Sequence, residues 1–147
     1  MKKMVLAASC AVAAMMMTGC SRSPSSVAEK FVDAVLQRDA DDALDYMDTN
    51  GLFEGQIKAK KEVLEAVGKD INDNKLEAEA EGEEILVPPE DAGYRLLNGK
   101  KYTGETATVT VRFVKGKDKK DEGMRVELVK VDGSWKVKDY DKANLPK

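Results

Sequence analysis

The sequence predicts an α+β domain, with helices first and antiparallel strands after them. Between about residues 26 and 69 the apolar residues recur with the period of an amphipathic helix. From residue 76 onwards they alternate with polar residues, which is typical of strands with one buried face. Because the helical and strand segments are separated along the chain, we expect helices packed on one face of an antiparallel sheet. The 147 residues suffice for one ordinary domain.

The chain starts with the features of a secretion signal. Lys2 and Lys3 precede an uncharged run from Met4 to Met17 that is rich in Ala, Val, Leu and Met. A helix that spans a membrane needs about 20 apolar residues. The run therefore has the length of the apolar part of a signal peptide and is too short for a retained transmembrane helix.

The run ends in Met17-Thr18-Gly19-Cys20, which resembles the lipobox of bacterial lipoproteins. The resemblance implies that residues 1–19 are removed as a signal peptide and that Cys20 is the lipid-attachment residue. Residues 20–25 then form a tether to a single domain at residues 26–147. Two or three acyl chains would hold the protein on a membrane without a basic patch. In envelopes of the enterobacterial type, Ser after the cysteine points to the outer membrane, facing the periplasm.

Three helices are expected in the first half of the domain. Ser26 and Glu29 have the spacing of a capping box, so the first helix is predicted to begin there. Its apolar stripe consists of Val27, Ala28, Phe31, Val32, Val35 and Leu36. Asp39 is the predicted cap of a second, short helix that runs to about Met47. A third helix is expected at about residues 56–69.

The second half of the domain is predicted to form strands. A strand of alternating Ala and Glu runs from Leu76 towards Val87, and Pro88-Pro89 ends it. After an Asn98-Gly99 turn comes a β-branched strand from Thr106 to Val114. The next segment, residues 115–123, is predicted to be a solvated loop of mixed charge. The Thr106–Val114 strand carries Ala107, Val109, Val111 and Phe113 on one side and Thr108, Thr110 and Arg112 on the other.

The last two strands are predicted to form a hairpin with a two-residue turn at Asp132-Gly133. This turn sets a register in which Leu128 faces Val137, Lys130 faces Trp135, Val126 faces Asp139 and Glu127 faces Lys138. The predicted core face carries Met124, Val126, Leu128, Trp135 and Val137. The register also places the carboxyl group of Asp139 on that apolar face.

Three segments together resemble a known fold family. They are VAEKFVDAVLQRDADDAL from Val27, TATVTVRF from Thr106 and VELVKVDGSWKV from Val126. Between Ser25 and about Tyr140 the chain is similar to small bacterial lipoproteins of unknown function with a nuclear-transport-factor-2-like fold. In that fold a curved antiparallel sheet wraps the helices into a cone whose mouth can hold a ligand. The superfamily contains isomerases, dehydratases, binding domains and dimerisation modules, so the fold alone assigns no chemistry.

The composition excludes several function classes. The chain has no His, which removes Ser-His and Cys-His nucleophile pairs and the commonest transition-metal ligand. Its net charge of −3, with the two signs interspersed, argues against a nucleic-acid partner. With Cys10 removed and Cys20 acylated, the mature domain would keep no thiol. No cofactor is expected.

Two segments match ligand-binding motifs only in part. The residues from Asp70 to Asn74, with Glu81, follow the spacing of an EF-hand calcium loop, but Lys75 occupies the position of its glycine. A polar turn is therefore the preferred interpretation, and no metal site is predicted. Gly99-Lys100-Lys101 lacks the spacing and the hydroxyl residue of a Walker motif, so nucleotide binding is rejected.

The remaining candidate site residues are aromatic side chains and one acid. The aromatic residues that could line a cone are Tyr46, Phe53, Tyr94, Tyr102 and Trp135, although core packing is the more frequent role for each. Asp139 could act as a base if it were buried on the apolar face. Its position near a strand end favours a solvated carboxylate.

The leading hypothesis is a lipid-anchored envelope protein whose domain binds a protein partner or a small apolar ligand and catalyses no reaction. The first alternative is a small cofactor-independent isomerase, dehydratase or hydrolase that uses a buried acid such as Asp139. The second is a structural envelope lipoprotein. The sequence leaves open whether the chain is a homodimer, and it assigns no catalytic residue.

Overall fold

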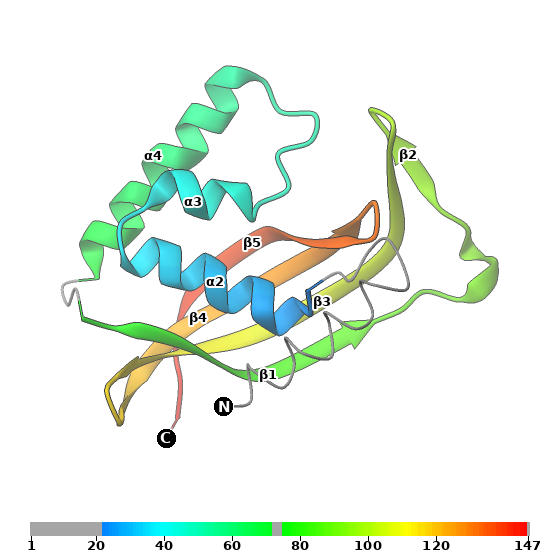
Figure 1. Ribbon diagram of the computed structural model, residues 1–147. Coiled ribbons are helices and arrows are strands. Elements are labelled where there is room, and N and C mark those ends of the chain that lie inside the picture. Colours follow the sequence, from blue (N-terminus) through cyan, green and yellow to red (C-terminus); the bar gives the residue numbers. More distant parts are fainter. Residues whose placement is uncertain (1–21, 72–74, 147) are drawn as a thin grey trace, which may run out of the picture.

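The computed structural model describes residues 22–71 and 75–146. In this part of the chain three α-helices and a five-stranded antiparallel sheet form an α+β domain, which confirms the predicted fold class (Figure 1). The predicted leader at residues 1–19 and the candidate lipid-attachment residue Cys20 lie outside the described residues.

The first helix, α2, spans Pro24–Leu36 and begins before the predicted capping box. Its N-cap is Ser23, whose hydroxyl accepts a hydrogen bond from the Ser26 amide at 3.1 Å. The prediction of Ser26 as the cap is therefore wrong. Pro24 explains the earlier start, because its fixed φ and missing N–H suit the first helical position. The Glu29 carboxylate accepts a hydrogen bond from the Ala80 amide of the sheet at 3.0 Å.

The second helix, α3, spans Ala40–Asp45. The predicted cap is confirmed, because Asp39 accepts a hydrogen bond from the Asp42 amide at 3.0 Å. The helix ends two residues before Met47, since the backbone there turns to the last strand. Val137 donates its N–H to the Tyr46 carbonyl at 2.7 Å, and the Val137 carbonyl accepts from the Asp48 amide at 2.9 Å.

The third helix, α4, spans Glu54–Asp70, slightly more than the predicted range. Its start is capped by Gln56, whose side-chain oxygen accepts a hydrogen bond from the Phe53 amide at 2.8 Å. Near its end, Gly68 lies so close to α2 that an added Cβ would come within 2.7 Å of the Val35 carbonyl oxygen. This glycine therefore sets how closely α4 approaches α2.

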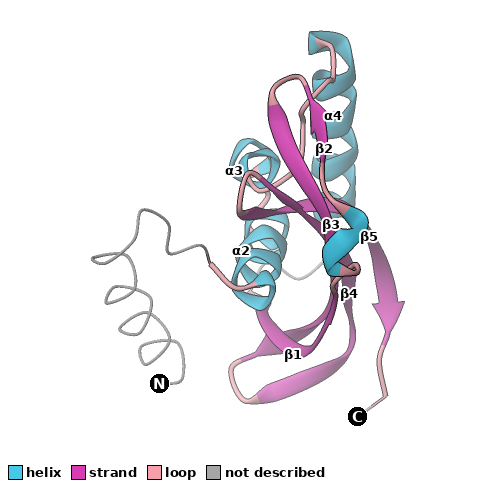
Figure 2. Ribbon diagram, turned by 90° about the vertical axis from the view of Figure 1, so that its right-hand side faces the viewer, coloured by secondary structure: helices cyan, strands magenta, loops and turns pink. Residues whose placement is uncertain are grey.

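The sheet has the strand order β1-β3-β4-β5, and the short β2 pairs with β3. The strands are β1 Glu77–Leu86, β2 Arg95–Leu97, β3 Lys100–Lys115, β4 Asp118–Val131 and β5 Ser134–Asn144. A short 3₁₀ helix, η1, occupies Glu90–Ala92 between β1 and β2. The helices lie over one face of this sheet, and the C-terminal segment leaves on the other side (Figure 2).

The strands β3 and β4 are longer than predicted and meet in a tight turn. Lys115 pairs with Asp118, and Gly116 between them has φ +62°. The prediction of a loop at residues 115–123 is therefore wrong. The charged residues of this segment lie on strands whose ends are in contact with solvent, where a high content of charge is compatible with sheet structure.

The C-terminal hairpin keeps the predicted register only near its turn. Leu128 faces Val137 and Lys130 faces Trp135, as predicted. A β-bulge then inserts one extra residue into β5, so that Glu127 faces Asp139 and Val126 faces Tyr140. The predicted pairs of Val126 with Asp139 and of Glu127 with Lys138 are wrong. As a result Tyr140 packs against the core and Asp139 is exposed.

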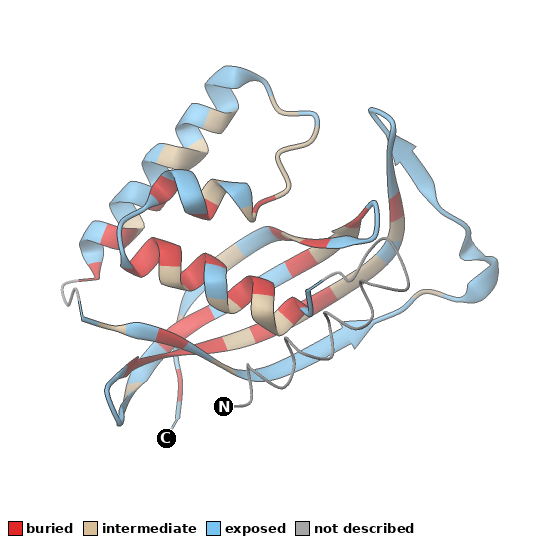
Figure 3. Ribbon diagram, in the orientation of Figure 1, coloured by how far each residue is buried: buried red, intermediate tan, exposed pale blue. Residues whose placement is uncertain are grey.

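The core lies between α2 and the helix-facing side of the sheet (Figure 3). The predicted stripe of α2 is buried, and so are the predicted core faces of β3, β4 and β5. The fully buried side chains include Phe31, Val32, Val35, Val109, Val111, Phe113, Met124, Val126, Leu128 and Val137. The hydrophobic pattern of the sequence therefore identified the two surfaces that pack together.

The opposite face of the sheet holds one buried cation that the sequence placed on the polar side of β3. Arg112 is only 5% exposed because the C-terminal segment covers it. Its guanidinium donates to the Glu81 carboxylate, and at 2.6 Å each to the carbonyls of Lys120 and Pro146. Leu145 is also buried and lies beside Gly123, where an added Cβ would come within 2.7 Å of it.

Candidate functional site

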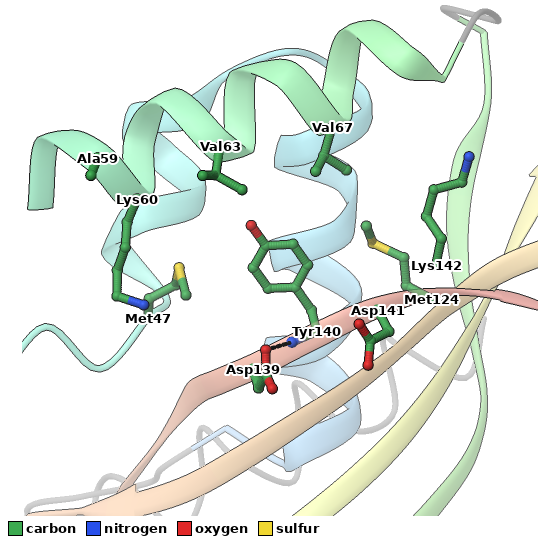
Figure 4. Close-up of a pocket in the computed structure, with 10 residues that line it drawn as sticks. All are labelled: Met47, Ala59, Lys60, Val63, Val67, Met124, Asp139, Tyr140, Asp141 and Lys142. Carbon is green, nitrogen blue, oxygen red and sulfur yellow. Dashed lines mark hydrogen bonds between the residues drawn. The ribbon is translucent and has the colours of Figure 1, made fainter. Parts of the chain in front are cut away.

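A groove of about 460 Å³ lies between α4 and the end of β5 (Figure 4). Its roof is formed by Val63 and Val67 of α4, and its floor by Met124 of β4 and Tyr140 of β5. Met47, from the segment after α3, closes one end. The walls are therefore mainly apolar, as in most small-molecule sites.

The helix α4 packs on its neighbours through one face and turns a second face, which lines the groove, towards the sheet. Leu64 is 2% exposed and Gly68 is buried, and these residues hold the helix on its neighbours. The adjacent Val63 is 54% exposed. In Figure 4 the side chains of Val63 and Val67 point from α4 towards Tyr140. The groove is thus open beneath Val63, whereas Val67 is partly buried against the core.

Tyr140 supplies the main polar atom inside the groove. Its ring contacts that of Phe31 at a centroid distance of 5.2 Å, and its hydroxyl points towards α4 (Figure 4). Burial raises the pKa of the Tyr140 phenol, and the neighbouring Asp139 carboxylate raises it further. The phenol is therefore neutral around neutral pH and can donate a hydrogen bond to a ligand.

Charged residues of both signs surround the groove. Lys60 of α4 and Lys142 of β5 contribute positive charge, and Asp139 and Asp141 contribute negative charge. Lys142 lies 4.0 Å from the Glu122 carboxylate. Asp139 accepts a hydrogen bond from the Tyr140 amide at 2.9 Å and is exposed to solvent. The rim is polar, and neither of its acids is a buried carboxylate, because Asp141 is exposed as well.

The structure does not bring the six candidate residues of the sequence analysis together. Of these, Asp139 lines the groove, whereas Tyr46 is partly buried against the core. Phe53, before α4, is 78% exposed. Tyr94, before β2, is exposed, with the Lys101 ammonium 4.5 Å from its ring centroid.

The other two aromatic candidates are structural. The Tyr102 hydroxyl donates to Asp48 at 2.9 Å and accepts from the Asn50 amide at 2.9 Å, and burial raises the pKa of its phenol. This cluster ties the segment after α3 to β3. Trp135 is 7% exposed and belongs to the core, with the Lys130 ammonium 5.5 Å from its ring centroid.

Most groove residues were not identified as site residues from the sequence. Met124 was assigned to the core, to which it and Met47 both belong. Tyr140 was missed because the bulge in β5 leaves no mark in the hydrophobic pattern. One signal in the sequence could have indicated the groove. Val63 and Leu64 are adjacent on α4, so the apolar face of this helix is broader than one packing contact requires.

The partial EF-hand motif lies mainly outside the described residues, which omit residues 72–74. Its last position, Glu81, is bound by Arg112. Within residues 22–71 and 75–146, no group of three or more acidic, His or Cys residues is arranged to hold a metal ion. In the same ranges no helix has the length and apolar character needed to cross a membrane.

The sequence was also compared with known proteins. No protein-family model matches the chain, and no curated protein matches it closely enough to count as a relative.

Proposed function

We propose that this protein is a lipid-anchored envelope protein whose domain binds a small apolar ligand in the groove between α4 and β5. The observation that carries the proposal is the groove itself, with an apolar roof and floor and one inward phenol. A ligand with an apolar body and one polar group would match this lining, because the body removes apolar wall from water and the polar group bonds to Tyr140.

Binding is favoured over catalysis by the position of the charged groups. The two acids at the groove, Asp139 and Asp141, are both exposed to water, and the buried groups around them are apolar apart from the Tyr140 phenol. A general acid or base generally requires a pKa adjusted by burial or by a charged partner. We therefore assign no catalytic role to any residue of the groove.

The lipid anchor is supported by the lipobox-like sequence that ends at Cys20. The folded domain starts almost immediately afterwards, since Ser23 already caps the first described helix. In this proposal a short tether holds the domain close to the membrane, and the outer membrane, facing the periplasm, is the expected location.

The domain is proposed to be a nuclear-transport-factor-2-like cone. Helices lie on one face of an antiparallel sheet, and the groove opens between a helix and that sheet, as the ligand mouth does in this fold. The cone would place the ligand at the open end of the helix–sheet sandwich.

The test fills the groove from its roof in a chain that starts at Ser21. We expect saturable binding of the apolar probe N-phenyl-1-naphthylamine to this chain, and we expect Val63→Trp to weaken it more than tenfold. Ala66→Trp is the matched control, because Ala66 is an exposed position on the same helix and does not line the groove. Thermal unfolding followed by circular dichroism shows that each variant is folded. Absent binding, or equal loss in both variants, would contradict the proposal.

A further inference from the structure

One edge of the sheet exposes an unusual amount of apolar surface. Eight large apolar side chains are highly exposed in the described chain, and six of them fall within residues 85–97, which we call the apolar arm. They are Ile85, Leu86, Val87, Tyr94, Leu96 and Leu97, each between 42% and 68% exposed. Because successive side chains of a strand point to opposite faces, these residues lie on both faces of the arm. Exposed apolar residues concentrated in one segment generally mark a site of interaction.

The arm is an ordered part of the sheet edge. Leu97 of β2 pairs with Lys100 of β3 across the Asn98-Gly99 turn, and both turn residues have positive φ. Pro88 packs over Gly104, where an added Cβ would lie 3.3 Å from its ring. Figure 3 shows the segment as exposed from the end of β1 through β2. The arm is thus held in place while its side chains remain in solvent.

The start of the folded chain lies beside the arm. Ser25 donates two hydrogen bonds to the Glu83 carboxylate, one from its amide at 3.0 Å and one from its hydroxyl at 2.7 Å. Glu83 is two residues from Ile85 on β1. Cys20 is five residues before Ser25, and five extended residues span at most about 18 Å. A lipid on Cys20 would therefore keep this edge of the sheet near the membrane surface.

The composition of the arm suits the boundary between lipid and water. Tyr94 is a residue type enriched at that boundary, and Arg95 of the arm and Lys101 beside it on β3 can bind headgroups while their stems cover apolar surface. The exposed acids Glu90 and Asp91 of η1 are the polar part of the arm and would stay on the water side. The Lys101 ammonium lies 4.5 Å from the Tyr94 ring centroid, which places charge and ring together.

A second copy of the chain fits the same edge less well. The strand β1 leads into the arm with glutamates at 77, 79, 81, 83 and 84. Two such strands side by side would place like charges opposite one another, which is unfavourable. The charge of β1 therefore argues against a β1-to-β1 dimer as the cover of the arm.

We propose that the apolar arm inserts into the interfacial layer of the membrane to which Cys20 is anchored, and this inference rests on the lipid anchor proposed above. The strand order places β1 and β2 at one edge of the sheet and β5 at the other. Insertion of the arm would thus fix the orientation of the domain and turn the groove beside β5 away from the membrane.

The experiment uses the processed, lipidated full chain in phosphatidylcholine vesicles. An environment-sensitive NBD fluorophore is attached to Leu96→Cys in the arm, and to Ala66→Cys on α4 as the control at an exposed position outside the groove. The wild-type chain is the labelling blank, since Cys20 is acylated and Cys10 leaves with the leader. Flotation of the vesicles measures anchoring, and quenching by brominated phosphatidylcholine measures insertion.

We expect both variants to float with the vesicles, with strong lipid quenching at position 96 and little at position 66. Flotation without quenching at position 96 would overturn the insertion of the arm and leave the anchor intact. If the NBD group at position 96 is shielded from water but is not quenched by brominated lipid, something other than lipid, such as a second copy of the chain, covers the arm. This result would also overturn the insertion. A chain that does not float, or a wild-type chain that reacts with the thiol label, would overturn the anchor and the insertion together.

Discussion

Arg112 lies on the side of β3 that was predicted to be polar, yet it is buried and stabilises the fold through its hydrogen bonds. An unpaired cation in a buried position is strongly unfavourable, so the guanidinium needs partners for its donors. Glu81 supplies the charge, and the carbonyls of Lys120 and Pro146 take two further donors. These contacts connect β1, β4 and the C-terminal segment at one point. Arg112 therefore fixes the end of the chain to the sheet.

The pairing of Glu81 with Arg112 predicts a pH dependence of stability. The hydrogen bond from Arg112 lowers the pKa of the Glu81 carboxyl below its ordinary value of 4.5. A carboxyl whose pKa is lower in the folded state stabilises the fold above the unfolded-state pKa, and this contribution is lost as the pH falls through the folded-state value. We expect Glu81→Gln to lower the urea midpoint at about pH 7 and to have a much smaller effect near about pH 3.

Urea unfolding across that pH range measures this effect. The matched control is Glu84→Gln, which changes an exposed glutamate on the same strand. We expect the control to leave the midpoint nearly unchanged at every pH. A Glu81→Gln effect that is equally large at both ends of the range would show that the charge of Glu81 does not stabilise the fold.

The C-terminal hairpin shows how far the site can be predicted from the sequence. The Asp132-Gly133 turn predicts the pairing of Leu128 with Val137 correctly, because a two-residue turn fixes the pairs next to it. The bulge beyond them changes which side chain faces inward, and no residue type is required at such a bulge. This single insertion exchanges Asp139 for Tyr140 in the core-facing position. The chemistry of the groove therefore depends on a backbone feature that the hydrophobic pattern does not encode.

At the scale of elements, α4 combines two requirements in one helix. Gly68 and Leu64 bring it against its neighbours, and Val63 and Val67 roof the groove. The close approach of Gly68 to the Val35 carbonyl determines the position of the whole helix. The shape of the groove is therefore set partly at a helix–helix contact outside it.

Two glycines of α4 provide a matched test of that contact. Gly68→Ala places a Cβ within 2.7 Å of a backbone oxygen, which α4 can relieve only by moving away from α2. Overpacking of this kind costs about 1–3 kcal/mol, and we expect weaker N-phenyl-1-naphthylamine binding as the roof of the groove shifts. Gly55→Ala has no neighbouring atom within 4 Å and should stabilise the helix by up to about 1 kcal/mol.

Urea unfolding and probe titration of both variants check the prediction. The opposite signs of the two stability changes are the critical result, because both substitutions replace a glycine of α4 with alanine and differ in the space around the new Cβ. Stabilisation of both variants would show that α2 and α4 tolerate a wider separation and that Gly68 does not position the roof.

The helices and the core faces of the strands are the parts of the fold that the sequence predicts best. The period of the apolar residues placed all three helices and the core faces of β3, β4 and β5, because burial of one face requires that pattern. The helix start at Ser23 and the turn after Lys115 were missed, since several serines and charged residues nearby suit a cap or a loop equally well. The polar residues alone therefore do not determine where this helix starts or where this turn lies.

At the scale of the whole molecule, the sheet separates two surfaces. The apolar arm belongs to the edge formed by β1 and β2, whereas the groove lies beside β5 at the opposite edge. The start of the folded chain is bound to the first edge through Ser25 and Glu83. In the proposed arrangement, the anchor and the arm face the membrane together and the groove stays accessible to a ligand from the aqueous side.

The lipid anchor itself is tested by exchanging the two cysteines of the chain one at a time. Cys20→Ala removes the thiol to which the diacylglyceryl group would be attached, so we expect loss of fatty-acid labelling, retention of the leader and loss of normal membrane fractionation. Cys10→Ala is the matched control, because this cysteine lies within the segment that the proposal removes. The readouts are metabolic labelling with an alkyne fatty acid, the intact mass of the protein, and the distribution between membrane and aqueous fractions. Labelling and fractionation of Cys20→Ala that match those of Cys10→Ala would mean that Cys20 carries no lipid. The apolar arm would then not be held near a bilayer by this residue.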